Sequence, residues 1–211
     1  MNFSPELSNE EKKVRECLDS EFYSKNDKAH MINHIDDVWR ETCELINEHK
    51  IEVRREVVFL GVYLHDIYSG PYRKVHNVLA KDFVMNAWRR DVEYLNMLVT
   101  LEEHELQQVA EMVYWHRSSL HPEEDWFTEK EWELINLIRA ADKGRPIFKI
   151  WLERARKYHG DEKDAVENMK KHFLEKYVPE GYIWKDEEYK KLYINDYITF
   201  QKDLKEWLKN N

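Results

Sequence analysis

A histidine and an aspartate end an apolar stretch near residue 60, and these two side chains have the clearest chemical potential in the sequence. The run Val57–Asp66 (VVFLGVYLHD) is almost entirely apolar until His65 and Asp66. Its length exceeds that of an ordinary strand and predicts a buried helix. A carboxylate at the carboxyl end of a helix faces the negative pole of the helix dipole, which costs roughly 0.3–1 kcal/mol unless a cation lies nearby. Because imidazole and carboxylate are both metal ligands, we expect a metal ion to supply that charge.

A second carboxylate, Asp142, has the same unusual position. In the stretch Glu129–Asp142, Ile135 and Ile138 form an apolar face that Asp142 continues at helical spacing. Glycine and proline residues follow within four positions and are expected to end the helix there. A carboxylate on the buried side of a helix end again requires a nearby positive charge.

His34 is expected to reach the same point because two helices have matching lengths. Apolar spacing predicts one helix that ends near Glu48 and another that runs from Ile51 to Asp66. His34 to Glu48 spans 14 residues, as does Ile51 to His65, and each span rises roughly 21 Å as a helix. In an antiparallel helical hairpin with so short a turn, the two histidines are expected to lie side by side at the open end of the hairpin. His34, His65, Asp66 and Asp142 are therefore the predicted metal ligands.

Three other histidines lie close to these positions in the predicted helices. His76 is expected in the first turn of a helix that follows the loop leaving Asp66, and His116 continues an apolar stripe and so points toward the core. Each of these two residues either takes part in the predicted metal site or makes a hydrogen bond that only stabilises the fold, and both alternatives remain open. His30, one turn before His34, fits either a supporting position or a helix start.

Basic side chains gather around Asp142 although the chain has a formal net charge of −9. An acidic chain repels nucleic acid, so the expected partner is a small phosphorylated metabolite or nucleotide and not a duplex. The alternative for the basic cluster is a solvated helix face. The residues expected to bind an anionic substrate are Arg139, Lys143 and Arg145 in this cluster, and Arg73 and Lys74 on the loop that leaves Asp66.

The composition predicts an all-α protein. Five glycines and five prolines in 211 residues, with 36% charged residues, favour long helices with solvated outer faces. We expect an N-terminal helix over 1–22 packed on the core, a catalytic helical domain over 23–158 and a C-terminal helical extension of the same domain over 159–211. A short helix is also expected over 91–99. The aromatic stripe of the last helix is interpreted as core, with a homodimer interface as the alternative.

The cysteines and the hydropathy favour a cytoplasmic location. Cys17 and Cys43 match no metal-binding or redox spacing, as expected in a reducing compartment. We find no apolar stretch as long as a membrane span and no signal-peptide core at the N-terminus, so we expect no membrane association.

The spaced histidines and aspartates resemble the HD superfamily of metal-dependent phosphohydrolases. The resemblance depends on His30 and His34 four residues apart, the His65–Asp66 doublet after an apolar helix, and Asp142 at a distant helix end. It covers about Asp27 to Arg145 and implies a single HD-domain-like helical bundle. It implies His34, His65, Asp66 and Asp142 as ligands of a divalent ion, with Mn²⁺ expected and Mg²⁺, Co²⁺, Ni²⁺ or Fe²⁺ as alternatives. It also implies that Asp66, His76 and His116 contribute to catalysis, the histidines by binding phosphate, donating a proton or holding a second metal.

The activity expected from this resemblance is hydrolysis of a phosphoester or phosphoanhydride bond in a nucleotide-like substrate by a metal-activated water. Two alternatives remain open. One is an HD-type di-iron oxygenase, in which His76 and His116 supply additional metal ligands. The other is a non-catalytic helical binding protein that retains the scaffold.

Overall fold

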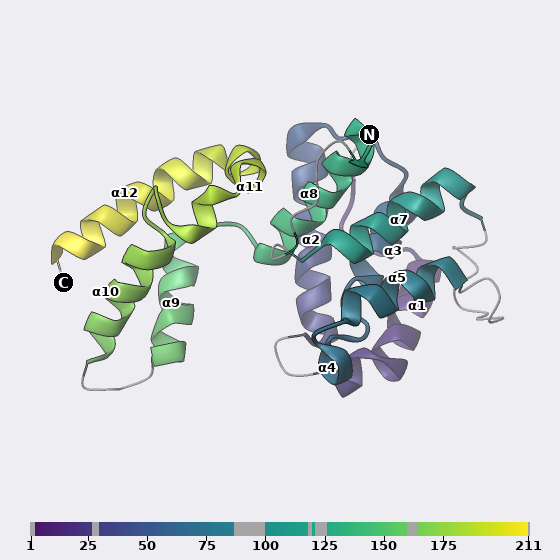
Figure 1. Cartoon of the computed structure of the whole chain (residues 1–211), viewed down its shortest axis with the longest axis horizontal. Coiled ribbons are helices and arrows are strands. Elements are labelled where there is room, and N and C mark those ends of the chain that lie inside the picture. The colour runs from purple at the N-terminus through teal and green to yellow at the C-terminus, as the bar shows by residue number, and fades with distance from the viewer. Residues whose placement is uncertain are drawn as a thin grey trace. The chain divides into compact units, whose positions relative to one another are not determined.

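The computed structural model confirms the all-α prediction (Figure 1). It describes residues 3–26, 30–86, 100–117, 120, 126–159 and 164–210, and the secondary structure in these ranges consists of helices without a strand. The helix expected over 91–99 lies outside the described residues. The chain divides into two compact units, Met1–Lys143 and Gly144–Asn211. This division places residues 144–158 with the C-terminal helices, whereas the sequence suggested a boundary at 158/159.

The first unit contains the helices that carry the histidine and aspartate residues. Its N-terminal helix begins at a capping box in which Ser8 and Glu11 bond each other's backbone amides, an arrangement that satisfies two donors at the helix start. The helices of this unit are α1 (Asn9–Glu21), the 3₁₀ turn η1 (Tyr23–Lys25), α2 (Ile32–His49), α3 (Arg55–Leu64), α4 (Ser69–Tyr72), α5 (His76–Asn86), α7 (Glu103–Trp115) and α8 (Glu129–Lys143).

Helix α3 is the buried centre of the first unit. Every residue from Val57 to Leu64 is buried, as its apolar run predicts, and the helix packs against α1, α2, α7 and α8 (Figure 1). A Cβ atom at Gly61 would lie 2.6 Å from Met112 Cε on α7, so this glycine allows close packing of the two helices. Because α3 is enclosed by the other helices, the side chains at its carboxyl end are held in the interior.

The turn between α2 and α3 is longer than the sequence suggests. Lys50 adopts a left-handed conformation (φ 56°) and ends α2, as residues just after helix ends commonly do. Ile51–Arg54 form a non-helical connection, so α3 begins at Arg55, four residues later than expected. The carboxyl end of α3 nevertheless faces the start of α2, where His34 lies.

The second unit has its own aromatic core. Its elements are α9 (Phe148–His159), α10 (Ala165–Lys176), η5 (Tyr182–Lys185), α11 (Glu187–Leu192) and α12 (Ile194–Asn210). Phe173 and Trp184 are buried together with Tyr193, Phe200 and Leu204 from the final stripe. This stripe therefore packs in the core of the second unit. Among the described helices, none combines the length and the apolar character needed to cross a bilayer.

Candidate metal site

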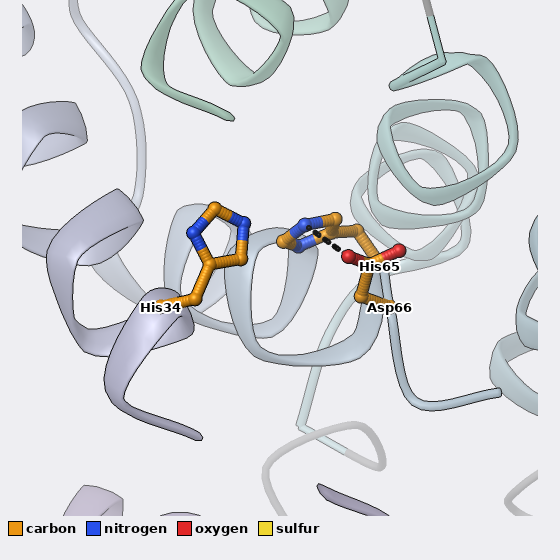
Figure 2. A group of neighbouring side chains, drawn as sticks. All are labelled: His34, His65 and Asp66. Atoms are coloured by element: carbon orange, nitrogen blue, oxygen red, sulfur yellow. Dashed lines mark ion pairs between the residues drawn. The ribbon is translucent and has the colours of Figure 1, made fainter. Parts of the chain in front are cut away.

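His65 and Asp66 directly follow α3 and are almost fully buried, with 0% and 4% of their surface exposed. His65 Nδ1 donates a hydrogen bond to the carbonyl oxygen of Val62 at 2.7 Å, which directs Nε2 away from the helix. Nε2 has no hydrogen-bond partner among the described atoms, although it lies 3.5 Å from Asp66 Oδ2 (Figure 2). A buried polar atom without a partner is costly. A metal ion ligated by this nitrogen would remove that cost.

His76 and His116 have the same orientation. Each donates from Nδ1 to the carbonyl oxygen three residues earlier, at 2.8 Å for His76 and 2.7 Å for His116. Their Nε2 atoms lie 3.2 and 3.5 Å from Asp66 Oδ1 and 3.1 Å from each other. Since both Nδ1 atoms act as donors, two neutral imidazoles would place their Nε2 lone pairs against one another across this distance. A proton on one Nε2 atom, or a cation, would relieve that repulsion.

His34 and Asp142 complete the cluster on its more exposed side. His34 Nε2 lies 3.0 Å from Asp142 Oδ1, and Asp142 Oδ1 lies 3.9 Å from His65 Nε2. The two side chains are 28% and 31% exposed, whereas His65 and Asp66 are enclosed. His30 lies beside His34, with ring centroids 6.1 Å apart. The structure therefore brings together the four predicted metal ligands and both additional histidines.

The cluster contains two overlapping groups of potential ligands. In the first, ligand atoms of His34, His65 and Asp66 lie within 4.8 Å of one another (Figure 2), and in the second, those of Asp66, His76 and His116 do so. Asp66 belongs to both groups, with Oδ2 toward His65 and Oδ1 toward His76 and His116. This buried cluster of histidines and aspartates could hold a metal ion, and its nitrogen and oxygen donors suit a divalent transition metal.

The surrounding groups keep both aspartates ionised. Burial would raise the pKa of Asp66, but the adjacent His65 and hydrogen bonds from His116 and His76 hold it well below the ordinary value. Burial would also raise the pKa of Asp142, and the hydrogen bond from His34 lowers it. Both carboxylates are therefore charged at neutral pH, the form in which they ligate metal ions.

The histidines respond differently to the same environment. Burial lowers the pKa of His65, which favours the neutral form that binds metal. Burial also acts to lower the pKa of His34 and His116, but hydrogen bonds to Asp142 and Asp66 outweigh it and raise both values. In the absence of a metal ion, these two histidines therefore tend to take up a proton.

The predicted substrate-binding residues have different surroundings. Arg73 and Lys74 are exposed between α4 and α5, and Lys143 is the half-exposed last residue of α8. Arg139 is only 8% exposed and donates to the carbonyl oxygens of Trp115 at 2.7 Å and Leu120 at 2.8 Å. Its guanidinium group therefore binds the backbone at the last residue of α7 and at Leu120.

Arg145 belongs to the second unit. There its Nη1 atom lies 3.3 Å from Asp196 Oδ2, and its guanidinium group lies over the ring of Tyr193. Its side chain is 24% exposed.

Sequence reasoning missed two polar residues that hold the chain around the cluster. Asn26 donates a hydrogen bond to the carbonyl oxygen of Asp66, and Arg117 donates one to the carbonyl oxygen of Lys74, each at 3.0 Å. Asn26 sits in a stretch that looks like an ordinary loop, and no local pattern distinguishes it. Arg117 could have been noted because it directly follows His116.

Comparison with known proteins identifies no relative. The chain matches no family model, no curated protein and no solved structure. The resemblance to the HD superfamily therefore stays a prediction from the spaced histidines and aspartates of the sequence.

Proposed function

We propose that this protein is a metal-dependent phosphohydrolase of the HD type that cleaves a phosphoester or phosphoanhydride bond of a nucleotide-like substrate. The observation that supports this proposal most directly is the position of Asp66. Its buried carboxylate lies within 3.5 Å of Nε2 atoms from three histidines, all of them oriented by backbone hydrogen bonds. Such orientation by a second hydrogen bond is typical of metal-ligating histidines.

The residues that would hold the ion are His34, His65, Asp66 and Asp142. Imidazole and carboxylate donors suit Mn²⁺, Fe²⁺, Co²⁺ or Ni²⁺, and we expect Mn²⁺, with Mg²⁺ as a weaker alternative. A divalent ion bound there supplies a Lewis acid for a phosphoryl oxygen and lowers the pKa of a water molecule toward neutrality.

The remaining residues would bind the substrate and move a proton. His34 and Asp142 are the more exposed ligands, so the substrate would approach from their side. The short distance between the Nε2 atoms of His76 and His116 suits a shared proton that could pass to the leaving oxygen. Exposed Arg73 and Lys74 would attract the phosphate group.

The test is a panel of nucleoside mono-, di- and triphosphates and cyclic nucleotides incubated with Mn²⁺-loaded protein. Release of phosphate, pyrophosphate or nucleoside is measured for the wild type, Asp66→Asn and Asp37→Asn. Asp37 is an exposed residue of α2 that pairs with Arg40, so its variant is a matched control. We expect at least one substrate to be cleaved by the wild type and the control but not by Asp66→Asn. Absence of product from every substrate, with metal bound, would contradict the proposal.

A di-iron oxygenase is the second candidate, and the sharing of Asp66 by two ligand groups favours it. If each group held an ion, Asp66 would belong to both ligand sets, and the irons would supply the reaction with dioxygen. Protein loaded with Fe²⁺ without oxygen would then contain about two iron ions per chain and would consume oxygen on exposure to air with substrate. A single ion per chain without oxygen consumption would leave the phosphohydrolase as the supported function.

A further inference from the structure

The carboxyl end of α3 requires hydrogen-bond donors from elsewhere in the chain. The last four carbonyl groups of a helix have no amide partner within the helix. In α3 the Val62 carbonyl is bonded by His65 Nδ1, as described above. The Tyr63 carbonyl accepts a hydrogen bond from the hydroxyl of Tyr23 at 2.8 Å, and both residues are buried. Just beyond the helix, the Asp66 carbonyl accepts from the Ser69 amide and from Asn26 Nδ2, each at 3.0 Å.

Both of these external donors belong to the short segment formed by η1 and the residue after it. Tyr23 is the first residue of η1, and Asn26 caps its end in an extended conformation. Their acceptors, Tyr63 and Asp66, are also three residues apart. This segment therefore contacts the end of α3 at two points that flank His65.

The side chain of Asn26 also fixes the chain after the doublet. Its Nδ2 atom is 3.0 Å from Ser69 Oγ, and its Oδ1 atom accepts a hydrogen bond from the Gly70 amide at 2.9 Å. The carbonyl of His30 is a further acceptor, at 3.1 Å from Nδ2. One amide group thus joins the segment before α2 to both ends of the turn Asp66–Gly70.

Tyr23 is suited to act as a permanent donor. It is completely buried, and burial together with the nearby Asp66 raises the pKa of its hydroxyl well above the ordinary value. The hydroxyl therefore keeps its proton at neutral pH and can donate it to the Tyr63 carbonyl.

We propose that Tyr23 and Asn26 are positioning residues of the metal site, which hold the carboxyl end of α3 so that His65 and Asp66 converge with the other ligands. Neither residue belongs to the two groups of potential metal ligands. They act through the backbone of Tyr63 and Asp66. This inference rests on the metal binding included in the proposed function, but it does not depend on the reaction.

Two pairs of variants separate positioning from general stability. Tyr23→Phe removes one buried hydroxyl bonded to a carbonyl, and Thr42→Val removes another buried hydroxyl, which is bonded to the Val38 carbonyl within α2. Asn26→Ala removes an amide that bonds backbone groups, and Asn47→Ala removes one that bonds both backbone groups of Phe3. The two control residues lie eight and 13 positions from the nearest ligand in the sequence, His34.

The dissociation constants of Mn²⁺ and Co²⁺ are measured by titration calorimetry, and the visible spectrum of the Co²⁺ form reports the ligand geometry. We expect about a tenfold weaker affinity in Tyr23→Phe and in Asn26→Ala, the range found when supporting bonds to metal ligands are removed. Their Co²⁺ spectra should also change. The control variants should bind within about twofold of the wild type, with unchanged spectra.

Unchanged affinities and spectra in both site variants would overturn the inference, even if their resistance to urea falls. Tyr23→Phe removes a single oxygen atom, so it decides the question if Asn26→Ala does not fold. If the wild-type protein binds neither Mn²⁺ nor Co²⁺, the metal site itself is contradicted. If it binds metal but releases no phosphate from any substrate, only the proposed reaction is contradicted.

Discussion

His34 Nε2 on α2 lies 3.0 Å from Asp142 Oδ1 on α8, across 108 positions of the sequence. The contact joins two packed helices at the exposed side of the candidate metal site. In the absence of metal, the bond requires a proton on His34 Nε2. A metal ion would use the same nitrogen and oxygen atoms, so the proton and the ion compete for one position.

This competition predicts that metal affinity falls as the pH is lowered. Burial opposes protonation of His34 and His116, but their hydrogen bonds to Asp142 and Asp66 raise the pKa of each above the ordinary value. Protons therefore begin to displace the metal at a pH above about 6.5, the usual pKa of histidine. Titrations from about pH 8 to about pH 6 should show a rising dissociation constant for Mn²⁺ and proton release on binding. An affinity that is constant over this range would contradict the prediction.

Replacement of Asp142 should abolish stabilisation by metal. Wild-type protein at a metal concentration of about 100 times the dissociation constant should gain about 2.7 kcal/mol in free energy of unfolding. Asp142→Asn keeps the shape of the side chain but loses the charged ligand, so most of this gain should disappear. Thermal unfolding with and without Mn²⁺ measures it. Asp37→Asn, on the exposed face of α2, should retain the full gain, and an equal gain in both variants would exclude Asp142 as a ligand.

The sequence predicted the elements of the site whose positions follow from apolar periodicity. The buried run before His65 and the apolar face that Asp142 continues both predicted where the helices end. His116 was expected to face the core on the same grounds, and it is 3% exposed. These predictions succeed because a helix that buries one face also determines the direction of the side chain that continues that face.

Hydrogen bonds from side chains to backbone groups far away in the sequence were not predictable in this way. The basic cluster around Asp142 suggested that Arg139 binds substrate, but its guanidinium group donates to the carbonyls of Trp115, at the end of α7, and of Leu120. The acceptors of Tyr23 and Asn26 lie 40 residues away. Whether a polar side chain meets a ligand or a carbonyl depends on tertiary packing, and a local pattern carries no information about it.

The surroundings of Arg139 predict a loss of stability when it is replaced. Arg139→Met leaves the carbonyls of Trp115 and Leu120 without these donors, and hydrogen bonds from a charged group contribute about 1.5–3 kcal/mol. We expect the free energy of unfolding in urea to fall by about 2 kcal/mol. Arg73→Ala, at an exposed position, should change it by less than about 0.5 kcal/mol and should raise KM if Arg73 binds substrate. A stable Arg139→Met variant with a raised KM would instead support the role expected from the sequence.

Gly70 permits the close approach on which the contacts of Asn26 depend, and its replacement should disrupt them. A Cβ atom at residue 70 would lie 2.6 Å from Asn26 Cα and 2.9 Å from the Lys25 carbonyl oxygen, so the backbone must move. We expect Gly70→Ala to lower the free energy of unfolding by about 1–3 kcal/mol and to weaken Mn²⁺ binding. Gly61→Ala is the comparison, because its Cβ atom meets the flexible end of Met112, which can move aside at lower cost. The free energy of unfolding in urea and the affinity for Mn²⁺ are measured for both variants. If Gly70→Ala lowers them less than Gly61→Ala does, the contact of residue 70 with Asn26 can adapt to the added methyl group, and the prediction is wrong.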